Sequence, residues 1–211
     1  MNFDEEALVW DKDPKKIERA KIVAKEIVNH IKPNQKLNAL EFGCGTGLLS
    51  FELKNDFNRI TLADNSEGMI NVLLKKIQTT GVENFDPILV DLQKDDIKIS
   101  KHDVIYTLMT LHHIPDLNSL LKKFNSIIVE NGYLCVADLV KEDGSYHAHE
   151  NDFNEQNGFE REELTRKLLY NNFKVEYYNV CLVIEKEVDN KVKKYPLFLM
   201  ICKKKSNLNN I

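Results

Sequence analysis

The 211-residue chain has few of the features that mark secreted, fibrous or membrane proteins. It has four cysteines and no CxxC pair, so neither a disulfide framework nor a cysteine-based metal site is indicated. No apolar run is long enough to cross a bilayer, and the longest, Tyr195 to Cys202, contains a proline. The opening segment, MNFDEEALVW, is acidic where a signal peptide is basic and then apolar. We therefore expect a cytoplasmic protein that has no membrane partner.

An excess of basic residues is also missing. The chain contains 29 lysines and arginines against 33 aspartates and glutamates, which gives a formal net charge of −4. No broad positive field is present to attract nucleic acid, so we do not expect nucleic acid as a partner. Hydrophobic residues make up 43% and charged residues 29%, a balance that is typical of globular proteins and excludes a disordered or fibrous chain.

Strand-like and helix-like hydrophobic patterns alternate along the chain. Helices are expected at Pro14–Ile31, Gly47–Lys54, Ser66–Gln78, Asp116–Val129 and Arg161–Tyr170. Strands are expected at Leu37–Phe42, Arg59–Ala63, Asp86–Val90, His102–Leu108, Tyr133–Leu139, Lys174–Glu187 and Lys193–Lys203. The last two are joined by Asp189-Asn190, which is a hairpin signal. The pattern predicts an α/β fold, a three-layer Rossmann-like sheet that is mostly parallel and has an antiparallel strand from the C-terminal hairpin.

A glycine cluster stands between the first expected strand and the helix after it. Three of only eight glycines, Gly43, Gly45 and Gly47, fall within this short segment. Such a cluster indicates a tight turn or a backbone that a ligand approaches closely, and ligands of parallel sheets bind at the carboxyl ends of the strands. The spacing GxGxG differs from the GxGxxG of nicotinamide-binding folds, and no Lys-Ser/Thr pair follows it as in a P-loop.

Acidic residues end the first three expected strands. Glu41 precedes the glycines, where its charge would repel a phosphate and suit a cationic ligand. Asp64 ends the second strand, a position from which an acid accepts hydrogen bonds from ribose hydroxyls. Asp91 ends the third, where a carboxylate can accept from an adenine amino group. A single strand-end aspartate usually forms a turn or caps a helix, but two behind a glycine turn favour a nucleoside ligand.

These residues resemble the motifs of the class I S-adenosylmethionine-dependent methyltransferases, over nearly the whole chain. The segment Glu41 to Gly47 is similar to the first motif of that family. Thr107 to Asp116, TLMTLHHIPD, is similar to the fourth-strand motif of its ubiquinone/menaquinone-biosynthesis-like branch. The resemblance implies that S-adenosylmethionine is the cofactor and that a methyl group moves by in-line displacement to a small-molecule acceptor. It also implies these cofactor-binding residues: Glu41, Phe42, Gly43, Cys44, Gly45, Asp64, Asn65, Met69, Asp91, Leu92, Leu108 and His113.

We find no internal repeat or linker, so we expect a single domain over residues 1–211. Residues 1–34 are expected to form an N-terminal helical cap and residues 35–140 the cofactor-binding half. Residues 141–205 are expected to contain a lid loop, a helix and the C-terminal hairpin. We expect the terminal segment KKKSNLNNI to be a frayed, solvated end.

Two histidines after the fourth expected strand are candidates for acid–base chemistry. His112 and His113 follow the strand at its carboxyl end, where the transferred methyl group is expected. His113 is the candidate base if the acceptor is a hydroxyl. The alternative for either histidine is a hydrogen bond that holds the loop. Cys44 lies between two glycines without a neighbouring histidine, so we expect it to fill space rather than to act as a nucleophile.

A polar loop from Lys141 to Gly158 carries two more candidate catalytic residues, His147 and His149. Together with the acidic residues that follow, these histidines could bind a metal ion, but we expect no metal. We expect instead a lid that closes, with Trp10 and the first helix, over the acceptor side of the cofactor. Long loops in compact domains are usually either functional or disordered, which favours such a role.

Other functions stay open on the sequence alone. A nucleic-acid methyltransferase is one alternative, although the acidic net charge and the lack of an NPPY-like run count against it. A regulatory protein that binds S-adenosylmethionine without catalysis is another. A nicotinamide dehydrogenase is a more distant third alternative, because the glycine spacing does not fit it.

Overall fold

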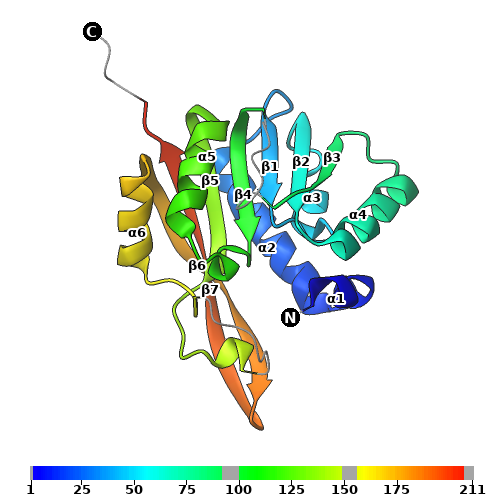
Figure 1. The fold of residues 1–211 in the computed structure, drawn as a ribbon, viewed down its shortest axis with the longest axis vertical. Helices are drawn as coiled ribbons and strands as arrows, with labels where there is room; N and C mark the ends of the chain where they lie inside the picture. The colour runs from blue at the N-terminus through cyan, green and yellow to red at the C-terminus, as the bar shows by residue number, and fades with distance from the viewer. Residues whose placement is uncertain (1, 92–99, 149–155, 207–211) are drawn as a thin grey trace.

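The alternating strand and helix patterns of the sequence build one mixed sheet. The structure is a computed structural model that describes residues 2–91, 100–148 and 156–206. Within these ranges seven strands pair in the order β3-β2-β1-β4-β5-β7-β6 (Figure 1). The first five strands in the chain run parallel, and β7 pairs antiparallel with both β5 and β6. The strands are β1 (Asn38–Phe42), β2 (Arg59–Asp64), β3 (Phe85–Leu89), β4 (His102–Leu108), β5 (Ile128–Leu139), β6 (Phe173–Val188) and β7 (Lys191–Lys204).

Helices cover both faces of this sheet, which confirms the three-layer Rossmann-like fold (Figure 1). One face carries α2 (Pro14–Ile31), α3 (Leu48–Leu53) and α4 (Glu67–Thr80), and the other carries α5 (Leu117–Ile127) and α6 (Arg161–Tyr170). Strand β4 is buried on both sides: Val104 and Tyr106 join the core beneath α2 to α4, and Ile105 joins the core beneath α5. Among the helices of the described ranges, none has the length and apolar character needed to span a bilayer.

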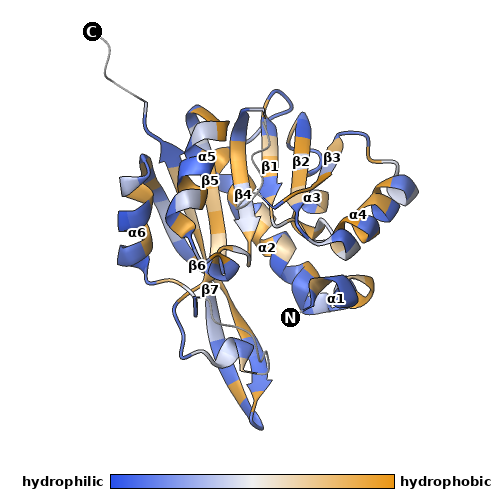
Figure 2. Cartoon of the chain, in the orientation of Figure 1, coloured by the Kyte–Doolittle hydropathy of each residue, from blue (hydrophilic) through white to orange (hydrophobic). Residues whose placement is uncertain are grey.

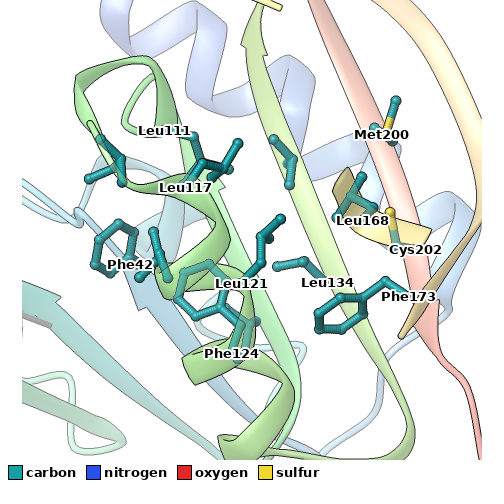
Figure 3. Close-up of a cluster of buried hydrophobic side chains, with 14 of the residues drawn as sticks. Phe42, Leu111, Leu117, Leu121, Phe124, Leu134, Leu168, Phe173, Met200 and Cys202 are labelled. Carbon is teal, nitrogen blue, oxygen red and sulfur yellow. The ribbon is translucent and has the colours of Figure 1, made fainter. Parts of the chain in front are cut away.

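The core beneath α5 shows how a helical sequence pattern becomes packing (Figure 3). Phe124 of α5 meets Phe42 of β1 edge-on, with the two ring centroids 5.3 Å apart. Burial of a side chain of this size stabilises the fold by about 1.5–3 kcal/mol. Figure 2 shows the same division across the molecule, with apolar strands in the interior and polar residues along the outer sides of the helices. The buried stripe of α5 is Leu117, Leu120, Leu121, Phe124 and Ile127.

Capping residues set both ends of α2 where the sequence predicts them. The Asp13 side chain accepts a hydrogen bond from the Lys15 N–H at the start of α2, and Pro14 occupies the first turn. Lys32 ends that helix in the left-handed conformation, one residue before Pro33. These caps satisfy backbone groups that the helix itself leaves unpaired. The expected bounds of α2, β4 and α6 are confirmed to the residue.

A helix that the sequence patterns did not predict, α1 (Phe3–Trp10), precedes α2. Its Asp4 carboxylate accepts from the Ser66 hydroxyl at 2.6 Å and from the Gly68 N–H at 2.8 Å. Gly68 allows this approach, because a Cβ atom there would lie 2.7 Å from the Cα of Asp4. An eight-residue helix is too short to be stable alone, so its formation depends on these contacts with the start of α4.

The expected end of the helix Asp116–Val129 and the expected start of the strand Tyr133–Leu139 are both wrong. Helix α5 ends at Ile127, and β5 already begins at Ile128, which pairs with His102 of β4. The register shifts after this pair, and Asn131 takes a left-handed φ of 62°. The local turn signal is therefore present, but strand pairing extends past it.

The C-terminal hairpin is confirmed, whereas the solvated end is wrong for its first residues. Asp189 and Asn190 have φ values of 51° and 59°, as a tight hairpin turn requires. Lys204 belongs to β7 and is only 6% exposed. Its Nζ donates to the carbonyl oxygens of Asn125 at 2.9 Å and Ile128 at 3.1 Å, at the end of α5. Residues 207–211 lie outside the described ranges.

We expect Lys204→Met to lower the free energy of unfolding by about 1–3 kcal/mol, because two buried carbonyl groups lose their donor. Urea unfolding followed by circular dichroism measures this change. Lys205→Met is the matched control, since the Lys205 side chain is exposed and should leave the transition unchanged. Equal transition midpoints for the two variants would contradict the capping role of Lys204.

Candidate functional site

Two loops meet where the strand order of the sheet reverses, between β1 and β4. The chain leaves these two neighbouring strands in opposite directions, which opens a crevice at their carboxyl ends. A cavity of about 760 Å³ lies there, lined by the segments that follow β1, β2 and β4 and by residues of α1 and α2. The cavity therefore lies beside the glycine cluster, where the sequence predicts a ligand site.

Two glycines of the loop after β1 are required for different structural reasons. Gly43 has a φ of +67°, and a Cβ atom there would lie 2.2 Å from Cγ2 of Thr110 in the loop after β4. Gly45 has a φ of +51°, and its Cβ would meet Sδ of Met69 at 3.8 Å and Nε1 of Trp10 at 4.0 Å. Gly43 thus lets two loops touch, and Gly45 presents bare backbone to the cavity.

Asp64, at the end of β2, holds the glycine loop in place by a hydrogen bond to its backbone. Its Oδ2 accepts from the Gly45 N–H at 2.7 Å, and its Oδ1 accepts from the Ser66 N–H at 2.9 Å. Burial raises the pKa of Asp64, and these backbone hydrogen bonds oppose that rise. The carboxylate is anchored on the wall of the cavity. The ribose-binding role that the resemblance implies stays a prediction.

Glu41, in β1, is a buried acid on the same wall. It accepts a hydrogen bond from the hydroxyl of Ser50 in α3, and that hydroxyl lies 2.7 Å from the hydroxyl of Tyr106. Burial removes water from the carboxyl group and raises the pKa of Glu41 to about 8, although the Ser50 hydrogen bond opposes the rise. A cationic ligand in the cavity would favour the ionised form.

The cavity brings together eleven of the twelve residues predicted to bind the cofactor, and Leu92 lies outside the described residues. Their contacts with a cofactor stay predictions. Cys44 is buried, which raises the pKa of its thiol well above the usual value and agrees with a space-filling role. The eleven are Glu41, Phe42, Gly43, Cys44, Gly45, Asp64, Asn65, Met69, Asp91, Leu108 and His113.

Two basic residues of the cavity wall were missed by the sequence analysis. Lys16 and Arg19 of α2 both line the cavity. They lie three residues apart, so they share one face of the helix, but they precede the glycine cluster by more than twenty residues, and no local sequence signal links the two. The Lys16 ammonium lies 3.2 Å from the centre of the Trp10 ring, and burial lowers its pKa.

Helix α1 lies at one side of the cavity. The rings of Phe3 and Trp10 are 6.0 Å apart between centroids, and Phe3 packs edge-on to His113 at 5.6 Å. After the helix, the Asp11 carboxylate accepts from the Thr46 hydroxyl and from Nζ of Lys76 at 2.6 Å. These contacts tie α1 to both the glycine loop and the segment after β4.

Histidines from two separate loops gather in the cavity, close to Phe3 of α1. His112 and His113 lie in the short helix η1 (Leu111–His113) after β4, and His147 lies in η2 (Ser145–His147) after β5. The Nδ1 of His112 is 2.6 Å from Oδ1 of Asp138, which is fully buried. His149, the other predicted catalytic histidine of the polar loop, lies outside the described residues.

The surroundings of His113 bear on its predicted role as a base. Burial, and after it the neighbouring His112 and His147, lower the pKa of His113 to about 3. The imidazole is therefore neutral at physiological pH and accepts a proton poorly. His112 has an aspartate partner of the kind that orients a base, so the geometry favours His112 for that role.

Residues 33–198 match a family model described as a methyltransferase domain. The chain belongs to this methyltransferase family. The match spans the strand β1, the glycine loop, the histidine segment and most of the C-terminal hairpin. The expected class I S-adenosylmethionine-dependent methyltransferase is thereby confirmed, and S-adenosylmethionine is its cofactor.

Curated relatives of the chain are named as methyltransferases. An uncharacterized methyltransferase of Schizosaccharomyces pombe is 29% identical over 129 residues, which are 58% of this chain and 45% of that protein. A malonyl-[acyl-carrier protein] O-methyltransferase of Ilyobacter polytropus is 30% identical over 107 residues, 50% of this chain and 40% of the relative. The chain thus spans less than half the length of these curated relatives.

A solved structure supports the fold of the methyltransferase. A Haloferax volcanii protein in complex with the Trm112 methyltransferase activator has a TM-score of 0.76 and 13% sequence identity, and the match covers 96% of this chain and 97% of that one. At this identity the likeness concerns the fold alone.

The cavity has the size of a small-ligand pocket, and its lining groups suit S-adenosylmethionine. Its volume of about 760 Å³ lies within the range of about 300–1,000 Å³ that is usual for small-ligand pockets. The bare backbone at Gly45 leaves room for close approach of a ligand. The desolvated carboxyl of Glu41 suits a ligand that bears a sulfonium and an ammonium group.

The raised pKa of Glu41 predicts how the stability of the methyltransferase changes with pH. The folded chain holds a proton that the unfolded chain, with a carboxyl pKa of 4.5, has released by pH 8. This contribution to stability is complete below pH 4.5 and is lost as the pH rises through about 8. Glu41→Gln removes it.

We therefore expect the difference in unfolding free energy between Glu41→Gln and the wild type to increase between pH 5 and 8, by at most about 1.4 kcal/mol per pH unit. Urea unfolding at a series of pH values measures this difference. Glu52→Gln is the control, since Glu52 is an exposed acid of the neighbouring helix α3. Parallel stability profiles for Glu41→Gln and the wild type would show that Glu41 is not shifted.

Proposed function

We propose that the protein methylates a small molecule that enters the histidine-lined end of the cavity. The observation that carries this proposal is that one cavity of about 760 Å³ contains both the glycine loop and the cluster of histidines. After the cofactor is bound, the remaining space suits a small acceptor better than a polymer. Helix α1 also borders this space through Phe3, whose ring packs against His113.

The charges of the cavity match the two ends of the amino-acid part of the cofactor. Glu41 of β1 supplies a carboxyl group that a cationic ligand would ionise, and Lys16 and Arg19 supply cationic groups from α2. Lys16 already lies over the Trp10 ring, which leaves Arg19 as the better candidate to bind a carboxylate. Asp64 and Asp91 stand at the adjacent strand ends, where we propose that they bind the ribose and the adenine.

The acceptor end has the groups needed to position a nucleophile. S-adenosylmethionine supplies an electrophilic methyl group, so the protein must hold the acceptor atom about 3 Å from it and in line with the breaking bond. Phe3 and Tyr146 line this end and exclude water, while His112, oriented by Asp138, can accept a proton from the acceptor.

The polar loop contributes to this end of the cavity. Tyr146 and His147 line it, and His147 is buried. The two ends of the loop are tied together, since the Lys141 N–H donates to the Phe159 carbonyl and the Glu142 N–H to that of Asn157. We propose that the loop acts as the expected lid. Residues 149–155, which include His149, lie outside the described ranges.

The comparisons support a small acceptor without identifying it. A Caenorhabditis elegans relative is named as a sterol 4-C-methyltransferase, and a Papaver bracteatum relative is named as a probable (S)-tetrahydroprotoberberine N-methyltransferase. We place the protein in the ubiquinone/menaquinone-biosynthesis-like branch on the motif TLMTLHHIPD, which includes His112 and His113. The net charge of −4 argues against nucleic acid as the acceptor.

Transfer of label from methyl-labelled S-adenosylmethionine tests the class of acceptor. We expect label in a cell-derived small-molecule extract and none in RNA, duplex DNA or protein fractions. Gly45→Val is the matched control, because a branched side chain at a φ of +51° is strained and projects toward the cavity, so transfer should be lost. Label in a polymer fraction, or in none, would contradict the proposal.

The role of Arg19 is tested by two ligands that differ in the amino-acid part. We expect Arg19→Gln to weaken binding of S-adenosylhomocysteine about 10-fold or more, because the carboxylate loses a charge-assisted hydrogen bond. Binding of 5′-methylthioadenosine, which has no carboxylate, should stay the same. Isothermal titration measures both affinities, and Arg161→Gln on the distant helix α6 is the control. Equal weakening of both ligands would exclude this role for Arg19.

A further inference from the structure

Three imidazole rings meet at the acceptor end of the cavity, although they come from two different loops. The candidate ligand nitrogens of His112, His113 and His147 all lie within 4.8 Å of one another. The ring centroids are 4.2 Å apart for His112 and His113, 5.1 Å for His112 and His147, and 5.3 Å for His113 and His147. The three rings therefore form one close cluster.

These separations are close to those of a three-histidine metal site. With metal–nitrogen distances of about 2.0–2.1 Å and tetrahedral angles, ring centroids stand about 5.2 Å apart and ligand nitrogens about 3.3 Å apart. Two of the three observed centroid distances agree with this value. The ligand nitrogens, which lie within 4.8 Å of one another, would approach to about 3.3 Å when they bind one ion.

A carboxylate behind the cluster already holds one of the rings. Asp138 is fully buried, and its Oδ1 lies 2.6 Å from Nδ1 of His112 and 2.7 Å from the Leu139 N–H. Histidines that bind metals usually donate their second ring N–H to such a carboxylate, which sets the tautomer. Nε2 of His112 is then the nitrogen that would bind the metal.

The electrostatics of the cluster suit a cation better than protons. A metal ligand must be a neutral imidazole, and the three rings lie close enough together to bind one ion. One divalent ion can satisfy three neutral rings at once, whereas protons on adjacent rings repel one another. Within the described part of the chain the cluster offers three protein ligands, which leave one tetrahedral position open, and all three histidines line the cavity.

We propose that His112, His113 and His147 bind a divalent ion of the zinc class, and that the methyl acceptor binds its fourth position through an ionisable O–H or S–H group. This inference rests on the proposed function and departs from the expectation that no metal is bound. It shares only His147 with the metal site considered for the polar loop. The ion would lower the pKa of the acceptor group.

Methyl transfer to this acceptor is a single displacement at the methyl carbon. The acceptor releases its proton to solvent, because both ring nitrogens of His112 are then occupied, and a lone pair of its oxygen or sulfur forms the bond to the methyl carbon. The bond from that carbon to the sulfonium breaks, its electron pair stays on sulfur, and S-adenosylhomocysteine leaves. No oxidant or reductant is required.

Metal binding is measured without any acceptor. We expect the chelator-treated full chain to bind about one equivalent of Zn²⁺ in isothermal titration, and Co²⁺ to produce the intense visible absorption of a tetrahedral site. His112→Ala, His113→Ala and His147→Ala should each weaken Zn²⁺ binding at least about 10-fold, and Asp138→Asn about 10–100-fold. His30→Ala is the matched control, since His30 is exposed and packs on Tyr177, far from the cluster in the chain.

Binding of S-adenosylhomocysteine by His112→Ala, His147→Ala and Asp138→Asn shows that the fold and the cofactor site persist, and it separates the two proposals. For His113→Ala, because His113 is itself a predicted cofactor contact, circular dichroism checks the fold instead. Loss of S-adenosylhomocysteine binding in the wild type would sink the proposed function, whereas a flat Zn²⁺ titration beside normal S-adenosylhomocysteine binding would sink only the metal site. Zn²⁺ binding that none of the three histidine substitutions weakens would place the ion elsewhere and also overturn the proposal. Once an acceptor is known, transfer that survives chelation unchanged would remove the ion from acceptor binding.

Discussion

The contact between Gly43 and Thr110 joins the two loops on which the whole site depends. These loops follow β1 and β4, the neighbouring parallel strands at which the strand order of the sheet reverses. Any side chain at Gly43 would collide with Thr110 and push the loops apart. Because they touch, the glycine backbone proposed to receive the cofactor lies next to the histidines proposed to face the acceptor. In-line methyl transfer needs both within a few ångströms.

The cavity gathers ionisable groups that the surrounding fold keeps away from water. Burial raises the pKa of Glu41 and Asp64 and lowers that of His113, so each group is pushed toward its neutral form. Such groups cost stability in the empty protein, and charged ligands recover that cost when they bind. The hydrophobic cores on both faces of the sheet, beneath α2 to α4 and beneath α5, provide the stability that makes this arrangement tolerable.

The elements that could be predicted are those whose signals are local. Helices α2 and α5 carry apolar stripes and capping residues within their own segments, and the hairpin turn at Asp189 and Asn190 needs only its two residues. Helix α1 has no such support, because Asp4 must reach Ser66 and Gly68 to hold it. The buried position of Lys204 and the early start of β5 likewise depend on partners distant in the chain.

The sequence by itself determined the alternation of strands and helices, the glycine loop and the acidic strand ends, and with them the family of the protein. Periodicity, turn chemistry and motif spacing are properties of neighbouring residues, so they can be read without a structure. Only the tertiary structure decided that His112, His113 and His147 lie in one cluster, with Asp138 hydrogen-bonded to His112. Parallel pairing of β4 with β5 brings the loops after both strands to one edge of the sheet. The physical reason is that pairing between distant strands, which no local pattern encodes, sets which side chains meet.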